Sequence, residues 1–132
     1  MKTVKVPDLS GPALDWVVAK CEGYLPSYTD PAKAVSPLYR DGEHVQLRAL
    51  PYSFDWSLAG PIIEREKMAL WFDGESNDYA ASGPLLMNTP TESQAFYGIP
   101  LPTHGPTPLI AAMRCYVASR LGDTVEIPEE LV

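Results

Sequence analysis

The feature that most constrains the fold is an apolar stretch close to the C-terminus. Thr107 is a typical N-cap and Pro108 suits the first helical position, so a helix is predicted to begin here and to end at Gly122. Apolar side chains cover much more than half of its circumference: Leu109, Ile110, Ala112, Met113, Tyr116, Val117 and Leu121. A helix that is apolar on nearly every side lies inside a fold, so other elements must surround this one.

A second helix is predicted from Leu9 to Gly23. Ser10 is a suitable N-cap, and apolar residues then recur at spacings of three and four, which places one stripe toward a core: Leu14, Val17, Val18 and Cys21. Alternation or a closing turn signal predicts four short strands, at Met1–Val6, Glu43–Leu50, Met68–Phe72 and Asp123–Ile127. The ranges 24–41 and 73–106 are rich in proline and polar residues and are expected to be loops, the first with a helical turn near 31–35.

The order strand, helix, strands, helix, strand predicts the α+β class. We expect a small, mostly antiparallel sheet with two main helices on one face, of which the C-terminal helix is largely buried. The chain has 132 residues, of which 45% are hydrophobic and 20% charged. This is the size and composition of one globular domain, which we expect to span residues 1–132.

The charge of the chain argues against several partners. Seventeen acidic residues against ten basic ones give a net charge of −7. Direct binding to nucleic acid or to an anionic membrane is therefore not expected, because both need basic surface. No apolar run approaches the ~20 residues of a membrane span, and the first residues lead into no signal-peptide core, so a cytoplasmic location is expected.

The common catalytic signatures are absent from the sequence. It contains no phosphate-binding glycine loop, dinucleotide fingerprint, nucleophile elbow or HExxH helix. Cys21 and Cys115 are far apart and are expected to be reduced and buried, and neither belongs to a CxxC pair. His44 and His104 have no ligand at metal-binding spacing, so neither a metal nor a cofactor is expected. His104 is expected to be a solvated loop residue.

Arg114 is the most informative single residue because it lies within the apolar C-terminal helix. A guanidinium there must reach water or find a partner, since an unpaired buried charge is strongly unfavourable. The first interpretation is an ion pair with one of four acids: Glu64, Glu66, Asp55 or Asp15. The second is an anion clamp that holds a carboxylate or phosphate of a ligand. The third is a solvated surface arginine.

The run Glu64-Arg65-Glu66 follows two isoleucines and also has two interpretations. It is an element entering solvent with local ion pairs, or it places one of the two glutamates in a pocket walled by Trp56. Desolvation in such a pocket would raise the carboxyl pKa toward general acid–base use. Trp56 and Trp16 are both expected in the core, and Cys115 is expected to be an inert buried thiol.

Three stretches resemble the phage NinX-like family: ALDWVVA at 13–19, GPIIERE at 60–66, and GPTPLIAAMRCYVAS at 105–119 with the following Leu121-Gly122-Asp123. The members of this family are small proteins from phage and prophage genomes that also occur in bacterial chromosomes. The resemblance implies a phage-derived accessory protein of the cytoplasm, and it brings no catalytic residue or cofactor. It places candidate contact residues in or beside the matching stretches: Asp55, Trp56, Glu64, Arg65, Glu66, Arg114 and Tyr116. The same residues would also serve a shared fold.

Three functions follow as hypotheses. The first is a non-enzymatic binding or interaction module for a host or phage protein, or for a small anionic molecule, using the surface near Trp56 and Arg65. The second is a small enzyme with Glu64 or Glu66 as acid–base and Arg114 as anion clamp. The third, ranked last because the acids are scattered, is an acidic mimic of DNA. A homodimer is also expected for a small domain with Tyr- and Trp-rich loops.

Overall fold

The computed structural model describes residues 1–26, 35–83 and 102–132. These ranges contain the helices α1 (Gly11–Cys21), α2 (Trp56–Arg65) and α5 (Pro108–Leu121), together with eight short strands. All strand pairs are antiparallel, and they are divided among three small sheets. The predicted α+β class is confirmed, with the antiparallel pairing distributed over three sheets where one was expected.

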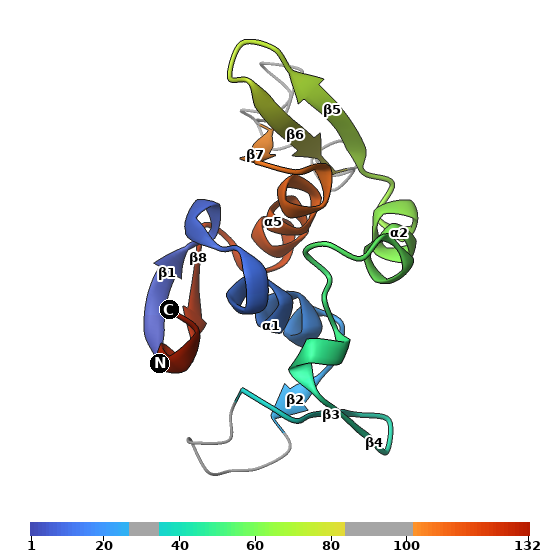
Figure 1. Ribbon diagram of the computed structural model, residues 1–132, viewed down its shortest axis with the longest axis vertical. Helices are drawn as coiled ribbons and strands as arrows, with labels where there is room; N and C mark the ends of the chain where they lie inside the picture. Colours follow the sequence, from blue (N-terminus) through green and yellow to red (C-terminus); the bar gives the residue numbers. More distant parts are fainter. Residues whose placement is uncertain (27–34, 84–101) are drawn as a thin grey trace.

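Each sheet is built from short strands. The first pairs β1 (Lys2–Lys5) with β8 (Thr124–Ile127), which brings the two ends of the chain side by side (Figure 1). The second joins β2 (Leu25–Pro26), β3 (Leu38–Arg40) and β4 (Glu43–Val45) in that order. The third joins β5 (Ala69–Asp73), β6 (Asp78–Ser82) and β7 (Thr103–Gly105). Sheets this small need packing against a helix to be stable.

Helix α5 provides that packing for the β1–β8 and β5–β6–β7 sheets from the middle of the molecule. It contacts α1, α2, β8 and the β5–β6–β7 sheet (Figure 1). As predicted, Thr107 caps its start, where Oγ1 accepts the Ile110 N–H at 3.1 Å, and Gly122 ends it with a φ of 90°. Half of its residues are buried, as an apolar central helix requires: Leu109, Ala111, Ala112, Met113, Cys115, Tyr116 and Val117. The prediction of a largely buried C-terminal helix is confirmed.

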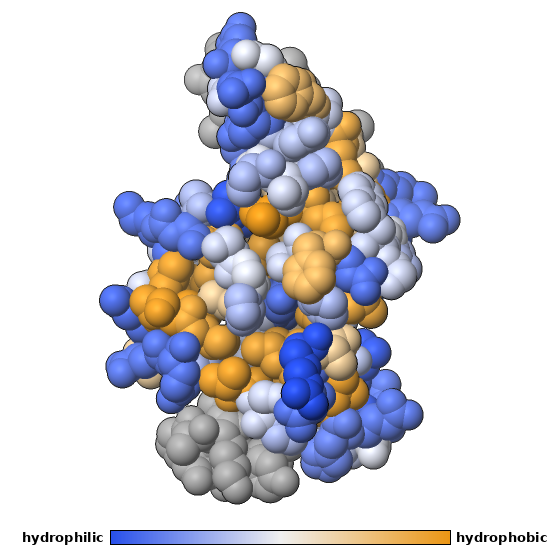
Figure 2. All heavy atoms as spheres, in the orientation of Figure 1, coloured by the Kyte–Doolittle hydropathy of each residue, from blue (hydrophilic) through white to orange (hydrophobic). Residues whose placement is uncertain are grey.

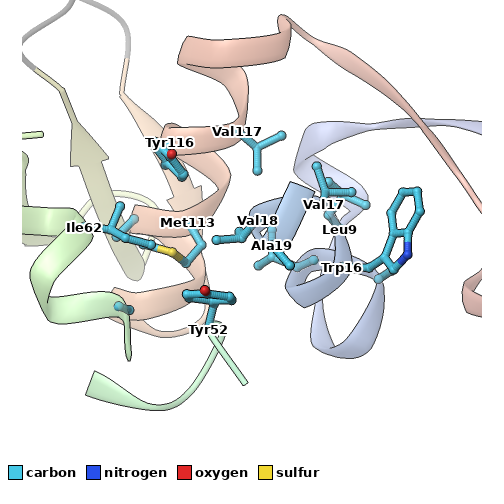
Figure 3. Packing of buried hydrophobic residues seen from close by; sticks show 14 of the residues in the cluster. Leu9, Trp16, Val17, Val18, Ala19, Tyr52, Ile62, Met113, Tyr116 and Val117 are labelled. Atoms are coloured by element: carbon cyan, nitrogen blue, oxygen red, sulfur yellow. The ribbon is translucent and has the colours of Figure 1, made fainter. Parts of the chain in front are cut away.

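Helix α1 is more deeply buried than one apolar stripe would require. Every residue from Ala13 to Ala19 is buried, including the charged Asp15. Ser10 is the N-cap residue as predicted, although its side chain makes no capping hydrogen bond. Figure 3 shows α1 side chains facing α5 across the core, with Trp16 on a side of α1 away from α5. The predicted core position of Trp16 is confirmed, because its side chain is fully buried.

Two sequence predictions about the middle of the chain are wrong. The strand predicted at Glu43–Leu50 ends at Val45, and Leu47–Ala49 forms the 3-10 helix η3. Leu47 and Leu50 are both buried. They are three residues apart, which is one turn of a 3-10 helix, so this turn places both side chains in the core. Part of the range 24–41 is not loop, because β2 and β3 occupy its two ends. The helical turn predicted near 31–35 lies mostly outside the described residues.

Helix α2 was not predicted, because Gly60-Pro61 reads as a turn. In the structure Pro61 lies inside the helix, which buries Ala59 and Ile62. The range 73–106 is likewise not all loop: the Asp73-Gly74 turn closes the β5–β6 hairpin, and β7 lies near its end. Residues 84–101 of this range are outside the described part. No helix in the described ranges is both long and apolar enough to cross a membrane.

Candidate functional site

Four charged side chains from three helices meet beside α5. The Arg65 guanidinium, at the end of α2, donates from Nη1 and Nη2 to the two carboxylate oxygens of Glu22, at 3.1 and 2.8 Å, and from Nε to Glu66 at 3.0 Å. Arg120 of α5 donates to both carboxylate oxygens of Glu66 at 3.2 Å. Together with Tyr116, we call these residues the ionic cluster.

Tyr116 lies under the ionic cluster and links it to the core. Its ring is buried, and the guanidinium carbons of Arg65 and Arg120 lie 5.7 and 5.3 Å from the ring centroid. The hydroxyl donates to Glu22 and accepts from Nη2 of Arg65 at 3.2 Å. Burial opposes ionisation of Glu22, yet the hydrogen bonds from Arg65 and Tyr116 outweigh it, and the pKa of Glu22 is lowered. Burial, followed by the bond to Glu22, raises the pKa of Tyr116.

Both arginines of the ionic cluster are therefore engaged by carboxylates of this chain. Two acids and two bases alternate, so their formal charges cancel, and the bidentate Arg65–Glu22 pair fixes the end of α1 against the end of α2. The arrangement clamps three helices together and presents no arginine free of a carboxylate.

Arg114 lies on the other side of α5. Two residues of α-helix turn through about 200°, so Arg114 and Tyr116 project in nearly opposite directions. The Arg114 guanidinium donates to two backbone carbonyls, from Nε to Leu9 at 2.7 Å and from Nη1 to His104 at 2.9 Å. Burial lowers the pKa of Arg114, while Asp8 and Asp78 act against that shift.

The prediction that Arg114 forms an ion pair with one of the four acids is therefore wrong. None of the four proposed acids contacts it, and two of its N–H groups donate instead to the carbonyls of Leu9, which precedes α1, and of His104 in β7. Glu66 belongs to the ionic cluster across the helix, so Glu66 and Arg114 do not share one site. The enzyme hypothesis with Glu66 as the acid–base and Arg114 as the anion clamp requires the two side chains in one site, and the structure does not bring them together.

His104 is paired and does not lie in a loop, which corrects the sequence expectation. It belongs to β7, and its Nδ1 lies 2.9 Å from Oδ1 of Asp78. Ser76 donates to the same carboxylate oxygen, and the hydrogen bonds from Ser76 and His104 lower the pKa of Asp78. A nucleophilic relay needs the imidazole between the hydroxyl and the acid, whereas here the hydroxyl and the ring both contact the acid.

Trp56 lies at the other end of α2 from Glu64 and Glu66, so it walls a pocket for neither glutamate. Glu64 is exposed near the end of α2, and Trp56 is the first residue of that helix, about 12 Å away along its axis. Trp56 is 54% exposed, so its expected core position is also wrong.

The exposure of Trp56 belongs to a larger feature, the turn formed by residues 51–56, which we call the aromatic turn. Tyr52 and Ser53 are buried within it, whereas Phe54 is 73% exposed. The backbone N–H groups of Phe54 and Asp55 both donate to the Pro51 carbonyl, at 3.2 and 2.9 Å. The chain is thus tightly turned, and two large aromatic side chains project from it.

Two carboxylates hold the aromatic turn, Asp15 near its middle and Asp55 near its end. Asp15, buried in α1, accepts the Ser53 N–H at 2.7 Å. Burial raises the pKa of Asp15, and its hydrogen bonds to Ser53 oppose the rise. Asp55 accepts the Ser57 N–H at 2.9 Å and so caps α2, and hydrogen bonds from Ser57 lower its pKa. The exposed aromatic side chains are therefore presented by a fixed backbone.

Sequence reasoning found part of this arrangement. It identified Arg65, Glu66 and Tyr116, which the structure brings together, but missed Glu22 and Arg120, which come from other helices. Cys115 is buried with its pKa raised by burial, as an inert thiol requires, and both cysteines are free. Among the described residues, no three histidine, cysteine or acidic side chains gather where they could hold a metal ion.

The sequence model of a protein family described as "Bacteriophage P22, NinX" matches residues 5–120. The matched range contains the aromatic turn, the whole ionic cluster and Arg114. No curated protein matches the chain.

Proposed function

This chain belongs to the bacteriophage P22 NinX family, and we propose that it is a non-enzymatic interaction module that binds a protein partner through its aromatic turn. Family membership makes it a phage-derived protein. The observation that carries the proposal is the exposure of Phe54 and Trp56 on a backbone fixed by buried Asp15.

Two exposed aromatic residues two positions apart on one turn differ from the isolated apolar side chains that every protein surface carries. Tryptophan is among the residues that contribute most to binding at protein interfaces. Binding is also weakened by the ordering of flexible surface segments. The hydrogen bonds of Ser53 and Asp55 have already fixed this turn, so little ordering remains when Phe54 and Trp56 enter a partner's pocket.

A protein partner fits the charges better than a small anionic molecule does. Arg65 and Arg120 are paired with carboxylates, and Arg114 donates to two backbone carbonyls. An anionic ligand would compete with these contacts on a chain whose net charge is −7. The same net charge favours a partner with a basic surface around an apolar pocket.

Photo-crosslinking in bacterial lysate tests the proposal. Phe54 is replaced by the photoreactive residue p-benzoylphenylalanine, which preserves an aromatic ring at this position. We expect illumination to give one predominant covalent adduct with a protein. The matched control carries the same residue at Leu121, which is 52% exposed at the end of α5, and should not give this adduct. Absence of a protein adduct from position 54, or the same adduct from both positions, would contradict the proposal.

A further inference from the structure

Strand β5 forms one edge of the β5–β6–β7 sheet. Within the described ranges it is hydrogen-bonded only to β6, so the polar groups on its other edge have no strand partner. The strand reads Ala69-Leu70-Trp71-Phe72-Asp73, and Trp71 and Phe72 are 42% and 54% exposed. Proteins usually protect such edges with lysine, proline or a charged residue pointing inward, and β5 has none of these before its last residue.

The two exposed aromatic residues of β5 project from opposite faces of the sheet, because side chains alternate along a strand. Leu70 and Phe72 share the face of Ala81, which belongs to the core. Trp71 lies on the other face, opposite Ala80. Phe72 packs edge-on against Tyr79, with the ring centroids 5.3 Å apart. A strand added to this edge would therefore meet an aromatic ring on each face.

We propose that the strand added to this edge is β5 of a second copy, paired antiparallel about a two-fold axis at Trp71. This register places Trp71 opposite Trp71 of the second copy and Leu70 opposite its Phe72. The contact uses the same surface on both copies, so it closes as a dimer and does not propagate. Two three-stranded sheets would become one six-stranded sheet. The surface is separate from the aromatic turn, so this inference goes beyond the proposed function.

The charges that flank β5 favour this antiparallel arrangement. Lys67 lies just before the strand and Glu75 just after it, and both side chains are exposed. Neither takes part in a salt bridge between described residues. Lys67 and Glu75 lie in the turns that flank β5, and antiparallel pairing about Trp71 brings the turn with Lys67 of each copy near the turn with Glu75 of the other, so opposite charges meet twice. Parallel pairing would bring like charges together.

Sedimentation velocity over a concentration series tests the dimer. The wild-type chain should show a reversible monomer–dimer equilibrium based on its 14.5 kDa mass. Trp71→Lys places a charge on the pairing strand and should leave only monomer. The matched control Phe54→Lys changes an exposed aromatic residue outside the edge and should dimerise as the wild type does. A wild-type chain that stays monomeric, or Trp71→Lys with an unchanged dissociation constant, would overturn the inference.

A charge reversal tests the register and does not depend on the Trp71 variant folding. Lys67→Glu should raise the dimer dissociation constant about tenfold, because two attractive pairs become repulsive. Adding Glu75→Lys to Lys67→Glu should restore the wild-type constant. A double variant as weak as the single one would show that these residues do not face each other. The crosslink from position 54 is read independently, so failure of the dimer and failure of the proposed function are distinguishable.

Discussion

At the scale of single residues, Asp15 connects the core to the surface that we propose for binding. Its carboxylate is buried in α1 and fixes the backbone of Ser53, 38 positions along the chain. The sequence offers Asp15 only as an acid available to pair with a base. Its role as an acceptor for a backbone N–H depends on a contact between distant segments, which no local pattern indicates.

Replacing Asp15 should separate hydrogen bonding from charge. Asp15→Ala is expected to lower the free energy of unfolding by about 1–3 kcal/mol, because it leaves the buried Ser53 N–H without an acceptor. Asp15→Asn keeps a carbonyl oxygen at the same place and should lose much less. Urea unfolding of both variants at neutral pH measures the difference. Equal losses in the two variants would mean that the hydrogen bond does not hold the turn.

The same residue should give a distinct pH dependence. Because burial raises the pKa of Asp15, the folded chain binds more protons than the unfolded chain between the ordinary and the raised pKa. The contribution of Asp15 to stability therefore falls as the pH rises through that window. Asp15→Asn should gain stability relative to the wild type between acid and neutral pH. A difference that stays constant with pH would contradict the raised pKa.

Glu22 should act in the opposite direction. Its pKa is lowered in the folded chain, so its contribution is present above the ordinary glutamate pKa and is lost as the pH falls through the folded-state value. Glu22→Gln should flatten the loss of stability at acid pH, as measured by urea unfolding at a series of pH values. Glu64→Gln, at an exposed site, is the matched control and should follow the wild type. If the wild type and both variants lose stability equally at acid pH, the lowered pKa of Glu22 does not contribute to that loss.

At the scale of elements, the sequence predicted those structures whose signals are local. Helix α5 was predicted because Thr107, Pro108 and Gly122 mark its ends, and the end of β5 was predicted from the Asp73-Gly74 turn signal, although its partner β6 was expected to be loop. Helix α2 was missed because Gly60-Pro61 usually breaks helices, although Asp55 provides a good N-cap. Apolar residues do recur at helical spacing within α2, at Leu58, Ile62 and Ile63, so its own sequence held a signal that the Gly60-Pro61 pair outweighed.

The ionic cluster shows the same limit. The alternating charges at Glu64, Arg65 and Glu66 suggested local ion pairs, and Arg65 does contact Glu66. The other contacts of the cluster reach Glu22 and Arg120, which lie 43 positions from Arg65 and 54 from Glu66. Only the packing of three helices against one another brings them together.

The contact between β7 and α5 should be the least tolerant to an added methyl group. A Cβ at Gly105 would lie 2.7 Å from the Ala111 backbone nitrogen, so Gly105→Ala must push the strand off the helix. We expect a loss of about 1–3 kcal/mol, as for other overpacked sites. Gly60→Ala is the control: a Cβ there meets nothing within 4 Å, and alanine should stabilise α2 by roughly 0.5–1 kcal/mol. Thermal unfolding of both variants measures these changes. A Gly105→Ala variant as stable as the wild type would contradict the close contact between β7 and α5.

At the scale of the whole molecule, α5 is the central helix: α1, α2, β8 and the β5–β6–β7 sheet contact it, whereas the β2–β3–β4 sheet lies beyond α1. Figure 2 shows apolar residues on the surface in patches between hydrophilic ones. The largest exposed apolar side chains include Phe54 and Trp56 on the aromatic turn and Trp71 and Phe72 on β5. The two proposed contact surfaces therefore lie on separate elements, so variants can change one and leave the other intact.

The central position of α5 also bears on the prediction of a single domain. If every element depends on α5, the chain should unfold in one cooperative step. Differential scanning calorimetry should then give one transition whose calorimetric and van't Hoff enthalpies agree. Two resolved transitions would indicate that one of the sheets, with its helix, forms a separate folding unit.

Quantitative affinity capture from bacterial lysate tests the central claim most directly, using the wild-type chain and the double variant Phe54→Ala/Trp56→Ala. The wild type should retain one protein in stoichiometric amount. The double variant should bind that protein at least about 30-fold more weakly, as expected for a loss of about 2 kcal/mol at an interface centre. Leu121→Ala, which changes another exposed apolar residue, should capture it normally. A wild-type chain that retains no protein stoichiometrically, or a double variant that retains it equally well, would contradict the account.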